Sequence, residues 1–82
     1  MQADIILPEL GVNPVILSLW FAETRDIVYE GDRLVEVVVE GATFDVAAPA
    51  TGRLTEKRAY PEDVLQPGQV LGVIEFDENN LG

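Results

Sequence analysis

Short apolar or alternating runs, separated by turn residues, make up most of this chain. No run combines the i, i+3, i+4, i+7 spacing of an amphipathic helix with capping residues. Residues 43–48 alternate instead, which predicts a strand with Phe44 and Val46 on one face and Thr43 and Asp45 on the other. The pattern predicts about eight strands, at residues 3–7, 15–21, 27–29, 34–39, 43–48, 53–59, 64–65 and 70–76.

Turn residues divide these runs, with glycine and proline between most of them. Many short strands at such spacing predict an all-β sandwich or a small barrel. We expect one domain over residues 1–77 and a flexible polar tail over residues 78–82. The predicted core positions are Ile6, Leu17, Leu19, Val28, Leu34, Val37, Phe44, Val46, Leu54, Leu65, Leu71 and Ile74.

An internal repeat runs through the chain with a period of 37 residues. Six positions of the first copy match the second in kind and in spacing, and they are Asp26/Asp63, Ile27/Val64, Val28/Leu65, Gly31/Gly68, Leu34/Leu71 and Val37/Ile74. Chance similarity between two hairpin segments is the alternative explanation. The repeat predicts two pseudo-symmetric halves, each contributing strands to both of two sheets. The glycines would stand at equivalent turns, because glycine adopts positive φ at low cost.

The segments around this repeat resemble the lipoyl/biotinyl carrier domain family, in particular the lipoyl domain of 2-oxoacid dehydrogenase acyltransferases. The resemblance covers roughly residues 5–76 and rests on residues 7–11, Trp20, 26–28, 31–37, 44–52 and 68–74. It implies a barrel-sandwich hybrid of two four-stranded sheets. It also implies a carrier function with lipoate or biotin on a lysine at an exposed hairpin turn, and the match does not choose between the two cofactors.

The chain departs from the family at that hairpin turn. Glu40 stands where the resemblance places an aspartate, and Gly41 stands where it places the modified lysine. Glycine has no side chain, so no amide to lipoate or biotin can form there, and we expect no prosthetic group. Glu40-Gly41 is either a simple two-residue turn or a docking tip for a partner. The glycines that the family usually has before its turn aspartates are replaced by Arg25 and Glu62.

Another amine is a poor substitute for the missing one. Lys57 is the only lysine of the chain, and it is the repeat mate of Trp20 rather than of a hairpin tip. We interpret Lys57 and Arg58 as solvated charges near the end of a strand. Modification of Lys57 is therefore not expected.

Two further groups of residues are candidate binding sites. Trp20 and Phe21 could stack on a ligand, but neighbouring strand residues point to opposite faces, so we expect one in the core and one partly exposed. Asp26, Glu30 and Asp32 lie near one turn, but their spacing does not match a calcium-binding loop. We expect no metal site and interpret this turn as solvated.

Composition narrows the possible functions. The chain has 82 residues, 48% of them hydrophobic, and a formal charge of −10, which disfavours nucleic acid and anionic membranes as partners. The acidity serves either solubility or attraction to a basic partner. The chain contains neither cysteine nor histidine, which excludes disulfides and the commonest general base. No apolar stretch of membrane-spanning length and no signal peptide is present, so the expected compartment is the cytoplasm.

These observations lead to two hypotheses. The first is a lipoyl-like domain without a prosthetic group, which is not an enzyme and acts as a monomeric protein-interaction or scaffolding module. The second, which the resemblance implies, is a carrier domain of an acyltransferase or carboxylase system. Covalent modification distinguishes the two.

Overall fold

The computed structural model describes residues 1–77, which form eight β-strands and no helix. Every strand end lies within two residues of the sequence prediction, and both ends of β7 coincide with it. The strands are β1 (Gln2–Ile6), β2 (Val15–Trp20), β3 (Ile27–Val28), β4 (Arg33–Val39), β5 (Ala42–Ala47), β6 (Gly52–Lys57), β7 (Val64–Leu65) and β8 (Val70–Glu75). The tail predicted at 78–82 lies outside the described residues.

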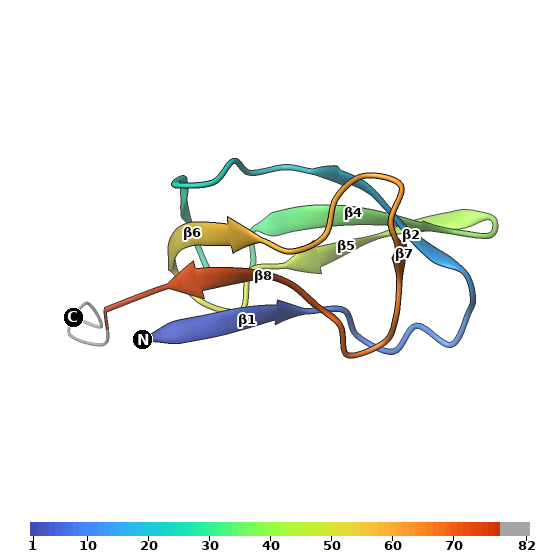
Figure 1. Ribbon diagram of the computed structural model, residues 1–82, viewed down its shortest axis with the longest axis horizontal. Coiled ribbons are helices and arrows are strands. Elements are labelled where there is room, and N and C mark those ends of the chain that lie inside the picture. The colour runs from blue at the N-terminus through green and yellow to red at the C-terminus, as the bar shows by residue number, and fades with distance from the viewer. Residues whose placement is uncertain (78–82) are drawn as a thin grey trace.

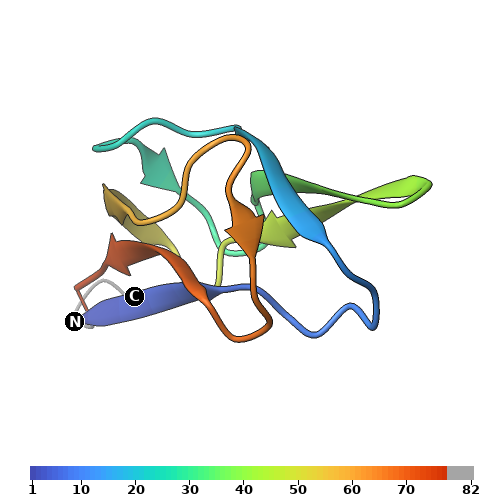
Figure 2. The same ribbon diagram turned by 45° about the vertical axis from the view of Figure 1, so that its right-hand side comes forward.

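The strands form two antiparallel four-stranded sheets that pack face to face (Figures 1 and 2). Sheet A has the order β1-β8-β6-β3, and sheet B has the order β5-β4-β2-β7. The β4–β5 hairpin extends beyond the rest of the sandwich at one end of the molecule (Figure 1). The predicted all-β fold of two four-stranded sheets is thus confirmed.

The two sheets are exchanged by the internal repeat. Replacing each of β1–β4 by its counterpart in β5–β8, and the reverse, converts the order β1-β8-β6-β3 into β5-β4-β2-β7. Each half of the chain therefore contributes two strands to each sheet, as the repeat predicts.

Main-chain hydrogen bonds between the strands repeat in the same way. Arg25 N–H donates to the carbonyl of Leu54 (2.6 Å), and Glu62 N–H donates to that of Leu17 (2.8 Å). The two glycine turns show the same correspondence. Gly31 N–H donates to the carbonyl of Ala48, and its repeat mate Gly68 donates to the carbonyl of Leu7. The turns of the first half thus have the same main-chain geometry as those of the second half, which explains why the matching residues recur at the same spacing.

The core lies between the sheets and consists of aliphatic side chains from both halves. Nine of the predicted core positions are buried, and they are Leu17, Val28, Leu34, Val37, Val46, Leu54, Leu65, Leu71 and Ile74. The sequence pattern missed further buried residues, which include Ile5, Leu7, Val15, Val35, Val39 and Val73. No polar or charged residue of residues 1–77 is buried.

Three predicted core positions are wrong, one of them because of a β-bulge. Ile6 is 49% exposed, because alternation along the chain places Ile5 and Leu7 inside and Ile6 outside. Leu19 is 39% exposed, because the register of β2 against β4 shifts between Leu17 and Leu19. Leu17 consequently pairs with buried Val37, whereas Leu19 pairs with Glu36 and turns outward.

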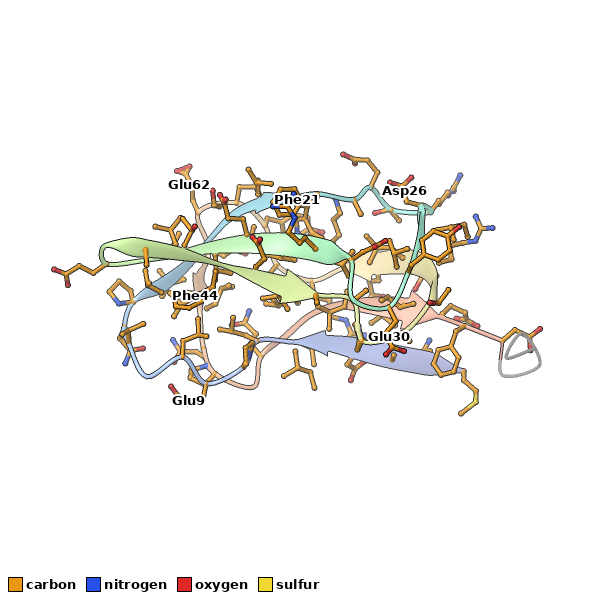
Figure 3. The ribbon with its side chains drawn as sticks, turned by 180° about the vertical axis from the view of Figure 1, so that it is seen from behind. Glu9, Phe21, Asp26, Glu30, Phe44 and Glu62 are labelled. Carbon is orange, nitrogen blue, oxygen red and sulfur yellow. The ribbon has the colours of Figure 1, made fainter. Side chains whose placement is uncertain are left out.

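The third wrong position is Phe44, whose exposed fraction is 44%. It lies on β5, the edge strand of sheet B, in the hairpin that extends past the sandwich (Figures 1 and 3). The other sheet does not reach far enough to cover its ring. Phe44 nevertheless lies on the same face of β5 as Val46, as predicted, since it pairs with buried Val37 and Val46 pairs with buried Val35. Val46, two residues further along β5, lies over the core and is buried.

Candidate functional site

The tip of the β4–β5 hairpin is the two-residue turn Glu40-Gly41. Val39 pairs with Ala42 directly before and after it, and Gly41 has a φ of 78°. Tight hairpin turns require such positive φ, which explains the glycine. A Cβ atom built on Gly41 would meet no heavy atom within 4 Å, so the turn is open to solvent on that side. The tip offers one carboxylate and no amine.

Lys57 lies on β6 in sheet A, whereas the hairpin tip belongs to sheet B. The environment of Lys57 differs from the one expected. The lysine is the last residue of β6, yet only 14% of its side chain is exposed. Its ammonium group lies 5.0 Å from the centre of the Trp20 ring and 3.7 Å from a carboxylate oxygen of Glu23. The interpretation of Lys57 as a solvated charge is therefore wrong, because the sequence does not reveal that the two repeat mates meet across the sandwich.

Arg58, the next residue, is solvated as predicted, with half of its side chain exposed. Its guanidinium pairs with Glu56, and this hydrogen bond raises the pKa of Arg58 above its usual value. The pair is short-range and open to water, so it does little to hold the fold together.

Trp20 and Phe21 differ in burial as expected for neighbouring strand residues. Trp20 packs against the core, and its indole N–H donates to the carbonyl oxygen of Ala59 (2.9 Å). Phe21 is 43% exposed, and the guanidinium of Arg33 lies 4.8 Å from the centre of its ring. The two rings do not form a shared platform for a ligand.

The acidic residues near the β3 turn are engaged by the main chain. An oxygen of Asp26 accepts the N–H of Glu23, and an oxygen of Asp32 accepts the N–H of Tyr29, both at 2.9 Å. Glu30 contributes its N–H to the hydroxyl of Thr51. The first aspartate has a counterpart in the second half, where Asp63 accepts the N–H of Tyr60. Asp26 and Asp63 each close a loop in the same way, which accounts for the repetition of this aspartate.

Within residues 1–77 no group of three or more acidic side chains is arranged to hold a metal ion. A depression of about 270 Å³ lies next to the same turn, lined by Phe21, Ala22, Asp26, Ile27, Val28, Asp32, Arg33 and Leu34. It is smaller than most small-molecule sites, and two of its polar groups already bond to the main chain. No helix in this part of the chain is long and apolar enough to cross a membrane.

The labelled side chains in Figure 3 mark the two ends of the molecule. Phe44 lies on the hairpin, and Glu9 and Glu62 lie toward the end that carries the hairpin tip. Asp26 and Glu30 lie toward the opposite end. Acidic residues thus lie toward both ends of the molecule, and Glu40 adds a charge at the hairpin tip itself.

Comparison with known proteins places this chain beside domains of acyltransferases. It is 28% identical over 75 residues to the lipoamide acyltransferase component of the branched-chain alpha-keto acid dehydrogenase complex of Pseudomonas putida. It is 27% identical over 75 residues to the dihydrolipoyllysine-residue succinyltransferase component of the 2-oxoglutarate dehydrogenase complex of Bacillus subtilis (strain 168). Each match covers 89% of this chain and 18% of the relative, so the chain spans less than a fifth of their length. No family model matches.

Among solved structures, the lipoyl domain of the 2-oxoglutarate dehydrogenase complex from Azotobacter vinelandii is similar, with a TM-score of 0.66 and 20% sequence identity. The match covers 85% of this chain and 87% of that domain. This likeness establishes the fold.

Proposed function

Since the chain resembles the lipoyl/biotinyl carrier domain family in sequence and has the fold of a lipoyl domain, we propose that it is a lipoyl-like domain without a prosthetic group. It acts as a non-catalytic protein-interaction or scaffolding module. The observation that carries the proposal is the hairpin tip, where Glu40-Gly41 offers no amine for lipoate or biotin. In this proposal, Gly41 stands at the position of the family's modified lysine.

The environment of Lys57 supports the absence of a cofactor. An attached group requires an accessible amine on an exposed turn. The ammonium of Lys57 instead lies against Trp20 and Glu23, and little of its side chain is exposed.

The chemistry of the chain supports a non-catalytic role. Histidine and cysteine are absent, and the depression near Asp26 has carboxylates that are already bonded to N–H groups. The named relatives are components of dehydrogenase complexes, which supports a protein as the partner of this domain. The formal charge of −10 disfavours nucleic acid and anionic membranes as partners. It is a monomer in the cytoplasm in this proposal.

The alternative function is that of a carrier domain in an acyltransferase or carboxylase system. The names of the relatives favour it. It requires a covalent group on Lys57 or on the amino terminus, because the hairpin tip has no acceptor.

The intact mass of the chain tests the proposal. The 82-residue chain is co-expressed with a lipoate ligase or a biotin ligase and the matching cofactor, and an unchanged mass is expected. The variant Glu40→Asp/Gly41→Lys, which places a lysine at the tip, serves as the positive control and gains the mass of one cofactor. The matched control Gly31→Lys also has a lysine at an open glycine turn with positive φ, and it stays unmodified.

A mass increase in the unaltered chain contradicts the proposal. Peptide mapping then identifies the modified amine, and a group on Lys57 supports the carrier function instead.

A further inference from the structure

The outer face of sheet B carries a row of apolar side chains. Ile16 on β2 pairs with Val38 on β4 and with Val64 on β7, so the three side chains stand next to one another on one face. Val38 is 38% exposed and Val64 is 58% exposed, whereas their neighbours Val37, Val39 and Leu65 are buried. Leu19, which the β-bulge turns outward, extends this apolar row along β2.

The internal symmetry provides a control for this observation. The repeat mates of Ile16, Val38 and Val64 are Arg53, Glu75 and Ile27, which form the corresponding row on the outer face of sheet A. Both rows occupy the same place in the same fold. Since sheet A has two charged residues there, the fold itself does not require apolar residues in this row of sheet B.

The charges around the two rows also differ. On sheet B, Glu36 pairs with Leu19 on one side and with Asp45 on the other, so acidic residues border the apolar row. Arg33, further along β4, is engaged by Asp45 at 3.5 Å. Beyond the other end of β4 lies Glu40 at the hairpin tip. The outer face of sheet A instead mixes both signs, with Arg53 and the Arg58–Glu56 pair.

We propose that this surface of sheet B, formed by Ile16, Leu19, Glu36, Val38 and Val64, binds a protein segment that presents an apolar side chain flanked by lysine or arginine. The apolar row supplies contact area, and the acidic border attracts and orients a basic partner. A second copy of the chain fits poorly, because two such faces would bring like charges together. The proposal rests on the proposed function as an interaction module and names its surface and its partner's chemistry.

Nuclear magnetic resonance with the ¹⁵N-labelled 82-residue chain tests this proposal. The probe is a synthetic peptide of alternating leucine and lysine, and the control peptide has glutamate in place of lysine. Amide shifts are expected to concentrate on β2, β4 and β7 with the lysine peptide, to weaken as salt is added, and to be absent with the glutamate peptide.

Matched variants separate this surface from general attraction to an acidic protein. Val64→Thr is expected to weaken binding by about fourfold, the equivalent of one lost methylene-sized contact. Ile27→Thr, at the equivalent exposed position of sheet A, leaves binding unchanged. In the same way Glu36→Gln weakens binding, whereas Glu75→Gln removes an equal charge from the other face without effect.

Shifts that spread over both sheets, or equal effects of the paired variants, overturn the surface proposal. The intact-mass experiment is independent of it. If the chain is unmodified and shows no localised amide shifts, only the proposed binding surface is contradicted. If the chain is modified and shows localised amide shifts, only the proposed absence of a prosthetic group is contradicted.

Discussion

Arg25 and Glu62 occupy equivalent positions 37 residues apart, and both have a left-handed backbone, with φ of 85° and 77°. Each residue precedes an aspartate that closes a loop, and each donates its N–H to the opposite half of the chain. L-residues with a Cβ atom rarely adopt this conformation, which costs about 1–2 kcal/mol. The related family usually has glycine at both positions, and the structure supplies the reason. This chain forms both turns with residues that are less suited to them than glycine.

Glycine at these positions is therefore expected to stabilise the domain. Arg25→Gly or Glu62→Gly relieves the backbone strain but adds freedom to the unfolded chain, which leaves a net gain of about 0.5–1 kcal/mol. For a domain of this size, this corresponds to a melting temperature higher by about 2–8 °C in thermal unfolding followed by circular dichroism. The neighbouring change Thr24→Gly is the control and lowers the melting temperature, since Thr24 has no positive φ to relieve. Equal shifts in all three variants would contradict the role of strain.

The two leucines on either side of the bulge in β2 differ sharply in burial. Leu17 is 1% exposed and Leu19 is 39% exposed. Leu17→Ala leaves a cavity between the sheets and is expected to lower the free energy of unfolding by about 3 kcal/mol in urea denaturation. Leu19→Ala, the same chemical change on the same strand, costs less than about 1 kcal/mol. Comparable losses would mean that the register of β2 differs from the one described.

Gly72 lies where no side chain fits. A Cβ atom there would stand 2.6 Å from the carbonyl oxygen of Glu56 and 3.0 Å from the Trp20 ring. Gly72→Ala must displace main chain and is expected to lower the free energy of unfolding by about 2–3 kcal/mol. Gly68→Ala meets no atom but keeps a φ of 82°, and it costs about 1 kcal/mol from strain alone. Urea denaturation compares the two, and a neutral Gly72→Ala would exclude the close approach of β6 and β8.

Lys57 and Trp20 stabilise the domain through a contact between repeat mates. Lys57→Met retains the apolar stem but removes the cation–π contact and the ion pair to the exposed Glu23. Together these two contacts contribute about 1 kcal/mol to the free energy of unfolding. The fluorescence of Trp20, the only tryptophan, reports both unfolding and the altered surroundings of its ring. Arg58→Met is the control and leaves the emission of the folded state unchanged, because Arg58 pairs with Glu56 instead. An unchanged emission in Lys57→Met would rule out the contact.

Much of the architecture was predictable from local patterns. Alternation and turn residues indicated eight strands, and the repeat of Asp26 and Gly31 at Asp63 and Gly68 indicated two equivalent halves. The two-residue turn at Glu40-Gly41 was also predictable, because a tight hairpin needs a glycine between two strong strands. These signals are local, since each depends on a few neighbouring residues.

The amino-acid sequence by itself thus determined the strand pattern, the twofold repeat and the absence of an amine at Gly41. Tertiary contacts decided which apolar residues face the core. The bulge beside Leu19 reverses a side chain without any mark in the sequence, and the aliphatic run at Ile5 and Ile6 does not indicate which of the two is buried. They also decided that Lys57 packs against Trp20. Periodicity reports the direction of a side chain relative to its neighbours along a strand, whereas burial depends on what the opposite sheet and the adjoining strands bring near it.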